Sequence, residues 1–237
     1  MQNTSIIQNY NAIMASGNYM VETKVTINNV DYFEDTIYSI KTFRAVFDEQ
    51  MLTIGNAYSG RIELSMILPA EEIPKAAEIK LFIRLKNDML VSDWLPKGVF
   101  YIYQREVDPE TGTLDIIGYD ALFRANRSYP SSSLAWGNNS PRARAVLDEI
   151  AGHIGVQLDN RTKSAIPASS QYIVAFPAQY SMRDVLGSIA AMYCGNFCMS
   201  DDGKLLLVGA VDLPTETYYL INELGDYITV GGLRILI

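Results

Sequence analysis

From about residue 19 to 119, apolar and polar residues alternate in several segments with a period of two, which is typical of β-strands. In the stretch that starts at Arg61, Ile62, Leu64, Met66 and Leu68 alternate with polar neighbours, which places one strand face in a core and the other in solvent. Six such segments follow one another, at residues 19–29, 36–47, 60–69, 77–86, 98–108 and 112–120. Short strands of this kind are typical of a sandwich or a barrel.

Turn-forming residues separate these segments. They lie at Asn28-Asn29, Gly55-Asn56, Lys86-Asn87-Asp88 and Asp108-Pro109-Glu110-Thr111-Gly112. In the last of these, proline presets the turn and glycine closes it. The sequence therefore predicts β-hairpins across the first half of the chain.

The composition changes after residue 129 to a Ser, Asn and Pro stretch, PSSSLAWGNNSPRARA, which indicates a domain boundary. The first of two predicted helices begins with Ser140 as N-cap and Pro141 at the first helical position, and ends at Gly152 and Gly155. One of its faces is apolar. That face consists of Val146, Leu147, Ile150, Ala151 and Ile154.

The second helix is predicted to begin at about Ser181 and to stop at Gly195. Its apolar face consists of Met182, Val185, Leu186, Ile189, Ala190 and Tyr193. RAVLDEIA at 144–151 matches RDVLGSIA at 183–190, and each is followed by a glycine and a short strand. Either one helix-strand unit is used twice, or two amphipathic helices match by chance.

A hairpin is predicted after the second helix, with Asp201-Asp202-Gly203 as its turn. The stretch YITVGGLRILI is apolar and strand-like, so we expect a further sheet element that this chain does not complete.

The charge pattern excludes some functions. The chain has 27 acidic and 19 basic residues, a net charge of -8, and its basic residues form no cluster, which argues against general or sequence-specific nucleic-acid binding. Two cysteines form no disulfide framework of the secreted kind. The sequence shows no signal peptide and no apolar stretch of membrane-spanning length, so we expect synthesis in a cytoplasm and no membrane insertion.

Cys194, Cys198 and the one histidine, His153, could form a three-ligand metal site. Buried cysteines that pack as small hydrophobes are far more common, so we expect both thiols to be reduced and metal-free. His153 is expected to cap the end of the first helix. Since the sequence has no G-x-S-x-G elbow around a serine, we predict no catalytic residue, no metal site and no enzymatic activity.

Other polar groups have simpler explanations than catalysis. Glu71-Glu72 and Asp201-Asp202 are expected to be solvated loop residues, and the 108–115 stretch lacks the calcium-loop pattern. No phosphate-binding glycine motif is present, so no cofactor is predicted. Trp94 and Trp136 could serve as platforms for a glycan, although packing over turns is the simpler interpretation.

The order of these elements resembles the phage tail hub proteins. The matching stretches are TIGNAYSGRIELSMIL, GYDALFRANRSY, RAVLDEIAGHIGVQLD and SMRDVLGSIAAMYCGNFCMSDDGKLLLV, and the resemblance covers about residues 19–210. They include the Gly55 turn before a strand, Gly118-Tyr119-Asp120 closing the barrel, and a helix followed by an Asp-Gly hairpin. The family comprises tail-associated, tail-endopeptidase-like proteins of phages and prophages of Gram-positive bacteria, similar in fold to the baseplate hub of contractile tails.

The resemblance implies an α+β, β-rich fold with a tube-like β-barrel domain at 1–125, an α/β domain with two amphipathic helices at 126–210, and the start of a second β-barrel at 211–237. It also implies a homotrimeric hub ring at the tail tip of a virion, around the DNA channel, with the distal tail or tail tube protein and the tape measure protein as partners. The alternative is a glycan-binding or cell-wall-hydrolase domain with a dispersed site.

Overall fold

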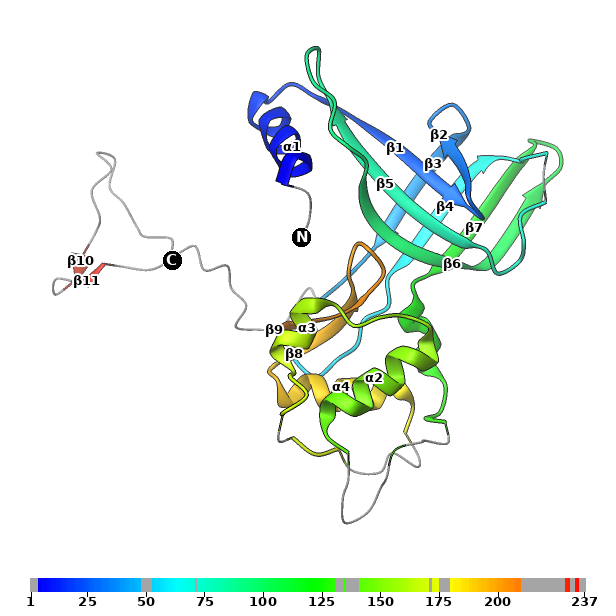
Figure 1. Cartoon of the computed structure of the whole chain (residues 1–237). Coiled ribbons are helices and arrows are strands. Elements are labelled where there is room, and N and C mark those ends of the chain that lie inside the picture. Colours follow the sequence, from blue (N-terminus) through cyan, green and yellow to red (C-terminus); the bar gives the residue numbers. More distant parts are fainter. Residues whose placement is uncertain are drawn as a thin grey trace.

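The computed structural model describes residues 4–47, 53–70, 72–130, 134, 141–170, 172–174, 180–209, 229–230 and 233–234. It consists of a large curled sheet and a smaller lobe of helices and a hairpin (Figure 1). The expected β-rich α+β class is therefore confirmed.

The large sheet has seven antiparallel strands in the order β2-β1-β5-β6-β7-β4-β3. They are β1 (Met20–Ile27), β2 (Val30–Phe33), β3 (Ile37–Phe43), β4 (Arg61–Ile67), β5 (Glu78–Lys86), β6 (Leu95–Asp108) and β7 (Thr113–Tyr119). All six predicted segments contain a strand, and β2 is an addition. The two edge strands, β2 and β3, are neighbours in sequence but do not pair, so the sheet is curled and open.

The inner face of this sheet forms the first of two cores. Ile62, Leu64 and Met66 of β4 are buried as the alternation predicts, whereas Leu68 lies beyond the strand end and is 42% exposed. The core contains Val25, Ile27, Ile62, Leu64, Met66, Ile73, Ala77, Ile79, Leu81, Phe100, Ile102, Leu114 and Ile116.

Two predicted turns of the sheet are confirmed by their backbone geometry. Asn28 and Asn29 have φ of 50° and 67°, the left-handed pair that a two-residue hairpin needs. In the β6–β7 hairpin Gly112 has φ of 67°, and the Asp108 carboxylate accepts hydrogen bonds from the backbone N–H groups of Glu110 and Thr111.

Three helical elements were not predicted from the sequence. The helix α1 (Thr4–Ser16) packs beside β5, and its Ser16 Oγ lies 3.4 Å from the side-chain nitrogen of Asn87. The 3-10 helix η1 (Ala121–Asn126) follows β7, and α3 (Asn160–Ala165) packs on β9.

The smaller lobe contains α2 (Ala143–Ile154), α4 (Met182–Met192), β8 (Gly195–Met199) and β9 (Leu205–Gly209). Every residue of the two predicted apolar faces is buried except Tyr193, which packs partly buried against the same core. The predicted hairpin is confirmed, with Gly203 at φ 76° in its turn. The core of this lobe contains Ala57, Ala121, Leu122 and Ala125 together with buried residues of α2, α4, β8 and β9.

The predicted start of α2 is wrong. The helix begins at Ala143 after Arg142, and Ser140 lies outside the described residues. Residues 141 and 142 are extended because they pair with residues 173 and 174: the Val174 N–H donates to the Pro141 carbonyl at 3.1 Å. This pairing prevents Pro141 from serving as the first helical residue. Gly155, at φ 79°, ends the helix as predicted.

The helix α4 begins as predicted. Ser181 forms a capping box with Asp184, in which each side chain accepts a hydrogen bond from the backbone N–H of the other residue. The helix ends at Met192, and the left-handed residue after it is Cys194 at φ 51°, whereas Gly195 already begins β8. The predicted stop at Gly195 is therefore misplaced.

The segment 53–58, which lies between β3 and β4 in sequence, leaves the large sheet and pairs with β8. The Tyr58 N–H donates to the Phe197 carbonyl and the Phe197 N–H donates to the Asn56 carbonyl, both at 2.8 Å. The backbone of this segment also passes close to α4, because a Cβ added at Gly187 would lie 2.6 Å from the Gly55 carbonyl oxygen. Segment 53–58 therefore connects the two lobes: it follows a strand of the large sheet and pairs with a strand of the smaller lobe.

In the expected region 211–237, β10 (Thr229–Val230) and β11 (Leu233–Arg234) form a two-residue antiparallel pair, and the other residues lie outside the described part of the chain. None of the described helices has the length and apolar character that crossing a bilayer requires.

Candidate functional site

A cleft of about 980 Å³ lies where the curled sheet meets the smaller lobe. Its walls come from the residues after β3, from the start of β6 and from the β8–β9 hairpin. Arg44, Lys97 and Arg161 supply positive charge there, and Asp120 and Asp201 supply negative charge. This is the candidate functional site, because it gathers titratable side chains from both lobes.

Arg44 spans the cleft. One guanidinium nitrogen, Nη1, donates to the Lys97 carbonyl of β6 at 3.1 Å and also pairs with the Asp201 carboxylate of the β8–β9 turn. The other, Nη2, donates to the Met199 carbonyl at 2.5 Å. One side chain thus joins the sheet to the hairpin, and the site serves as an electrostatic clasp between the lobes.

Asp120 is the most buried acid of the cleft, at 4% exposure. Its Oδ1 accepts hydrogen bonds from the Ser59 hydroxyl at 2.8 Å and the Leu122 N–H at 3.0 Å, and its Oδ2 accepts from the Gly60 N–H. Burial raises the pKa of this carboxyl to about 6, although the hydrogen bonds from Gly60 and Ser59 oppose the shift. Asp120 therefore fixes the junction of β4, β7 and η1.

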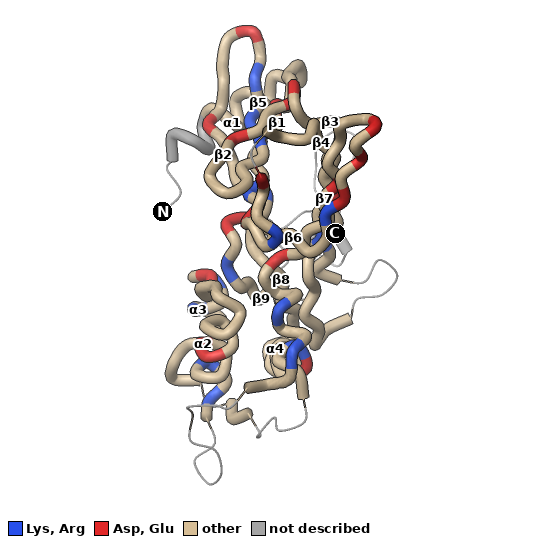
Figure 2. Tube along the Cα trace, turned by 90° about the vertical axis from the view of Figure 1, so that its right-hand side faces the viewer, with Lys and Arg blue, Asp and Glu red and all other residues tan. Residues whose placement is uncertain are grey.

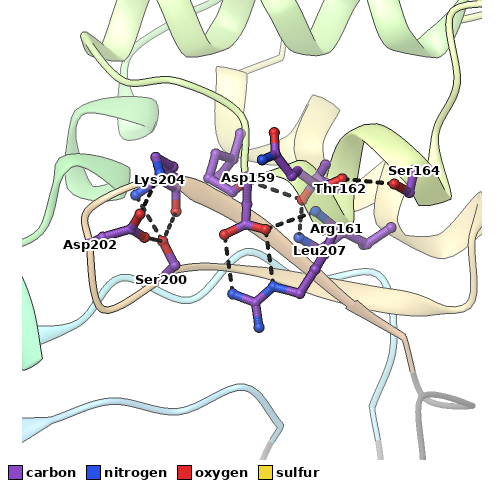
Figure 3. Close-up of polar contacts among 10 residues, drawn as sticks. Asp159, Arg161, Thr162, Ser164, Ser200, Asp202, Lys204 and Leu207 are labelled. Atoms are coloured by element: carbon purple, nitrogen blue, oxygen red, sulfur yellow. Dashed lines mark hydrogen bonds and ion pairs between the residues drawn. The ribbon is translucent and has the colours of Figure 1, made fainter. Parts of the chain in front are cut away.

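The rim of the cleft beside β9 is held by short-range polar contacts (Figure 3). Asp159 caps α3 and pairs with the Arg161 guanidinium at 3.0 and 3.1 Å, and these hydrogen bonds lower the pKa of the Asp159 carboxyl. The Thr162 hydroxyl donates to the Leu205 carbonyl at 3.1 Å and accepts from the Leu207 N–H at 2.8 Å. These groups fasten α3 to β9.

The hairpin turn is also stabilised from within. The Ser200 hydroxyl donates to the Asp202 carboxylate at 2.5 Å, and the Lys204 ammonium pairs with the same carboxylate at 2.5 Å (Figure 3). Asp201 and Asp202 therefore serve as ion-pair and turn partners, as expected of loop residues. Glu72 pairs with Arg105 at 3.4 Å, and Glu71 lies outside the described residues.

The cysteines and the histidine lie in different settings. Cys194 is exposed after α4, whereas Cys198 is buried in β8, where burial raises the pKa of its thiol to about 11. His153 is exposed in the last turn of α2. Within the described ranges no three His, Cys, Asp or Glu side chains gather as a metal site would require. Reduced, metal-free cysteines remain a prediction.

Trp94 lines the cleft, and two basic side chains lie over its ring. The Arg84 guanidinium lies 4.5 Å from its ring centroid and the Lys24 ammonium 5.3 Å. Cation–π contacts of this kind hold the ring against β1 and β5, in agreement with packing as the simpler interpretation. Trp136 lies outside the described residues.

The sequence analysis missed Arg44 and Arg124. Arg124 of η1 lies 3.8 Å above the Tyr101 ring and donates to the Ile154 carbonyl at 2.8 Å, which ties η1 to α2. Arg44 lies outside the matching stretches, Arg124 lies in one of them without a predicted role, and both contact residues distant in sequence. Asp120 was included in a matching stretch, but its role as an acceptor for three donors is visible in the structure alone.

Comparison with known proteins finds no matching family model and no matching curated protein. Among solved structures, the 43 kDa tail protein of prophage MuSo2 from Shewanella oneidensis has a TM-score of 0.52 and 14% identity over 89% of this chain. A tail protein from Neisseria meningitidis MC58 has a TM-score of 0.53 and 11% identity over 85% of this chain. The chain covers 61% and 54% of the lengths of these two proteins. It shares its fold with phage tail proteins.

Proposed function

We propose that the chain is a structural subunit of a phage or prophage tail, in which it forms a hub ring that joins the tail tube to the tip and surrounds the DNA channel. The observation that carries this proposal is the fold similarity to two tail proteins over more than four fifths of the chain. In the assembled virion the subunit would lie at the tail tip.

The curled sheet suits this role. Its two edge strands, β2 and β3, are joined by the short turn at 34–36 but do not pair, so the sheet curls around its core as an open counterpart of a tube-like barrel domain. By resemblance to the hub proteins, three copies with two such barrels each would match a six-fold tube. The proposed partners are the distal tail or tail tube protein and the tape measure protein.

The polar chemistry of the cleft supports a structural role. Charged groups of the cleft have hydrogen-bond partners within the protein, as is seen for Arg44, Asp120, Asp159 and Asp202. These contacts hold the elements around the cleft together. We therefore propose that the subunit has no enzymatic activity. Zymography on bacterial cell walls tests this, and a cleared band that disappears in His153→Ala would contradict it.

The excess of acid over base suits a channel for DNA. Lysine and arginine contacts to phosphate would hold DNA and slow its passage, so a lumen wall should be acidic or neutral. Binding to duplex DNA at physiological salt is expected to be weak. Tight binding that falls steeply with added salt would contradict a passive channel.

Electron microscopy of the purified protein, combined with mass measurement over a range of concentrations, tests the ring itself. The expected result is a closed three-fold particle with a central lumen. A monomer at every concentration, or a particle without a lumen, would contradict the proposed hub role.

A further inference from the structure

The outer face of β3, β4, β7 and β6 carries a continuous row of aromatic and arginine side chains. The strand register places Phe43 opposite Arg61, Arg61 opposite Tyr119, and Tyr119 opposite Tyr101. Tyr101 ends the row under the Arg124 guanidinium, where it packs against the core of the smaller lobe. This row lies on the face opposite the sheet core, because the neighbouring Ile62 points inward. Aromatic residues and arginine are enriched at protein interfaces and among their hot spots.

A β-bulge in β6 adds a projecting tyrosine to this row. The pairing with β7 shifts between Ile102 and Gln104, so Tyr103 is the extra residue of the bulge, and it is 63% exposed. Its ring packs edge-on against Tyr119 and Phe123, both at 5.3 Å between centroids. Bulges re-aim side chains and are often found beside functional sites. The bulge thus presents a supported aromatic side chain to solvent.

A shallow acidic pocket of about 230 Å³ lies next to the aromatic row on the same face. Glu106 and Asp115 stand directly opposite each other across β6 and β7 and both line the pocket, together with Glu63 and Lys41. Like charges in opposite positions destabilise a sheet. Arg61 neutralises Glu63, but Glu106 and Asp115 have no ion pair with any described residue. The pocket therefore fits a basic side chain from a partner.

The other side of the curled sheet offers such side chains. The outer face of β5 carries Lys80, Arg84 and Lys86. Lys86 is paired with Met20 of β1. Lys80 pairs with Glu78 at 2.7 Å and Lys86 with Glu22 at 3.5 Å, but the two lysine side chains keep 41% and 50% of their surface exposed. Met20 is 68% exposed. Figure 2 shows basic and acidic residues together on the β1–β5 side and a run of acidic residues on the β3–β7 side.

We propose that these two faces bind each other between copies of the chain. The acidic pocket and Tyr103 of one copy receive Lys86, Lys80 and Met20 of the next copy. An acidic face repels a second acidic face, so a two-fold contact through this face is disfavoured, whereas a head-to-tail contact generates a ring when the rotation closes. This inference rests on the proposed ring and assigns its subunit interface.

Charge reversal with rescue tests the contact in the whole chain. Lys86→Glu and Asp115→Lys should each weaken assembly by about tenfold or more, as coupled ion pairs across an interface do, and the double variant should recover most of that loss. Sedimentation velocity over a concentration series measures the change. Lys163→Glu, an exposed reversal of the same sign on the smaller lobe, is the matched control and should assemble like the parent protein.

A photo-crosslinking residue placed at position 103 gives a second readout that does not depend on charge. Crosslinked peptides should come from β1 and β5 of another copy. Crosslinks between two β6–β7 regions, or a ring whose mass resists both reversals, would overturn this interface while leaving the hub role intact. A parent protein that stays monomeric would overturn both proposals. Loss of glycan binding in Tyr103→Ala without a change in assembly would also overturn the interface, since the face would then be a sugar site.

Discussion

The curled sheet and the smaller lobe differ in how many large apolar side chains they expose. In the smaller lobe, α2 and α4 bury their apolar faces, and the large apolar side chains that stay exposed in its described residues are Tyr172, Ile173 and Tyr180. The sheet exposes many more, including Met20, Val30, Phe33, Tyr38, Phe43, Met89, Leu90, Val91, Tyr103 and Val107. Scattered exposed apolar residues are ordinary, but groups of them mark contact surfaces.

This difference indicates that the two regions contribute differently to the stability of the subunit. The smaller lobe buries most of its apolar residues in its own core, whereas the sheet leaves apolar and charged surface exposed. Substitutions in the smaller lobe should therefore lower the stability of the isolated subunit, and substitutions on the outer sheet should change assembly with little effect on stability.

The largest effect is expected from Ile150→Ala in α2. Ile150 is fully buried, and loss of its side chain leaves a cavity that should lower the free energy of unfolding by about 2–5 kcal/mol. Urea denaturation measures the loss. Ile173→Ala is the matched control, since that isoleucine is 60% exposed and should cost under about 0.5 kcal/mol. Equal losses in the two variants would contradict these different contributions.

A pH effect of similar size is expected from Asp120. The pKa of this carboxyl is about 6 in the folded protein against an ordinary value of 3.8, so the folded state holds the proton more tightly than the unfolded state does. Stability from this group is present below about pH 4 and is lost as pH rises to about 6, on the order of 3 kcal/mol in total.

Asp120→Asn removes this titration. The stability of the parent protein minus that of the variant should fall between pH 4 and pH 6 and level off above, as measured by urea denaturation at each pH. A difference that is flat over this range would show that Asp120 is not shielded from water. Glu110→Gln, at an exposed turn position, should leave the pH profile of the parent protein unchanged.

A smaller effect is expected where α4 contacts segment 53–58. Gly187→Ala places a methyl group against the Gly55 carbonyl and should lower the unfolding free energy by about 1–3 kcal/mol, a typical cost of overpacking. Gly152→Ala is the matched control, because it lies in α2 with open space around it and should raise stability by about 0.4–1 kcal/mol. Melting temperatures of both variants separate the effect of the contact with segment 53–58 from the effect of helix propensity.

The smallest effect is expected from Met89→Ser, at the tip of the β5–β6 loop. Met89 is 88% exposed, and the loop is held by Asn87, whose side-chain oxygen accepts hydrogen bonds from the Met89 and Leu90 N–H groups. The unfolding free energy should change by less than about 0.5 kcal/mol. A loss above about 1 kcal/mol in urea would mean that this tip is part of the folding core.

The sequence predicted the elements whose pattern is local. Alternation located the six main strands, and the turns at Asn28-Asn29, Asn87 and Gly112 located hairpins, because side-chain period and turn geometry depend on neighbouring residues. The predicted turn at Gly55-Asn56 lies instead in the segment that pairs with β8. The apolar faces of α2 and α4 and the capping box at Ser181 were readable for the same reason. The strand β2 was missed because VDYF is short and follows directly after a two-residue turn.

The features that could not be predicted depend on distant pairing. The start of α2 moved because residues 173 and 174 hold Pro141 and Arg142 extended. The exposure of Tyr103 follows from a register shift between strands, which a single sequence does not reveal. Arg44 finds its partners more than 150 residues away, in the β8–β9 hairpin, so no local signal marks it as the clasp.

The pairing of segment 53–58 with β8 also sets an order of events during synthesis. Asn56 and Asn196 are 140 residues apart, and a ribosome adding about 5–20 residues per second needs roughly 7–28 s to cover that distance. During this interval the sheet can begin to form, while segment 53–58, which connects β3 to β4, lacks its partner β8. The newborn chain therefore carries an unpaired edge until its smaller lobe is made, and factors that bind such edges would act on this protein in that window.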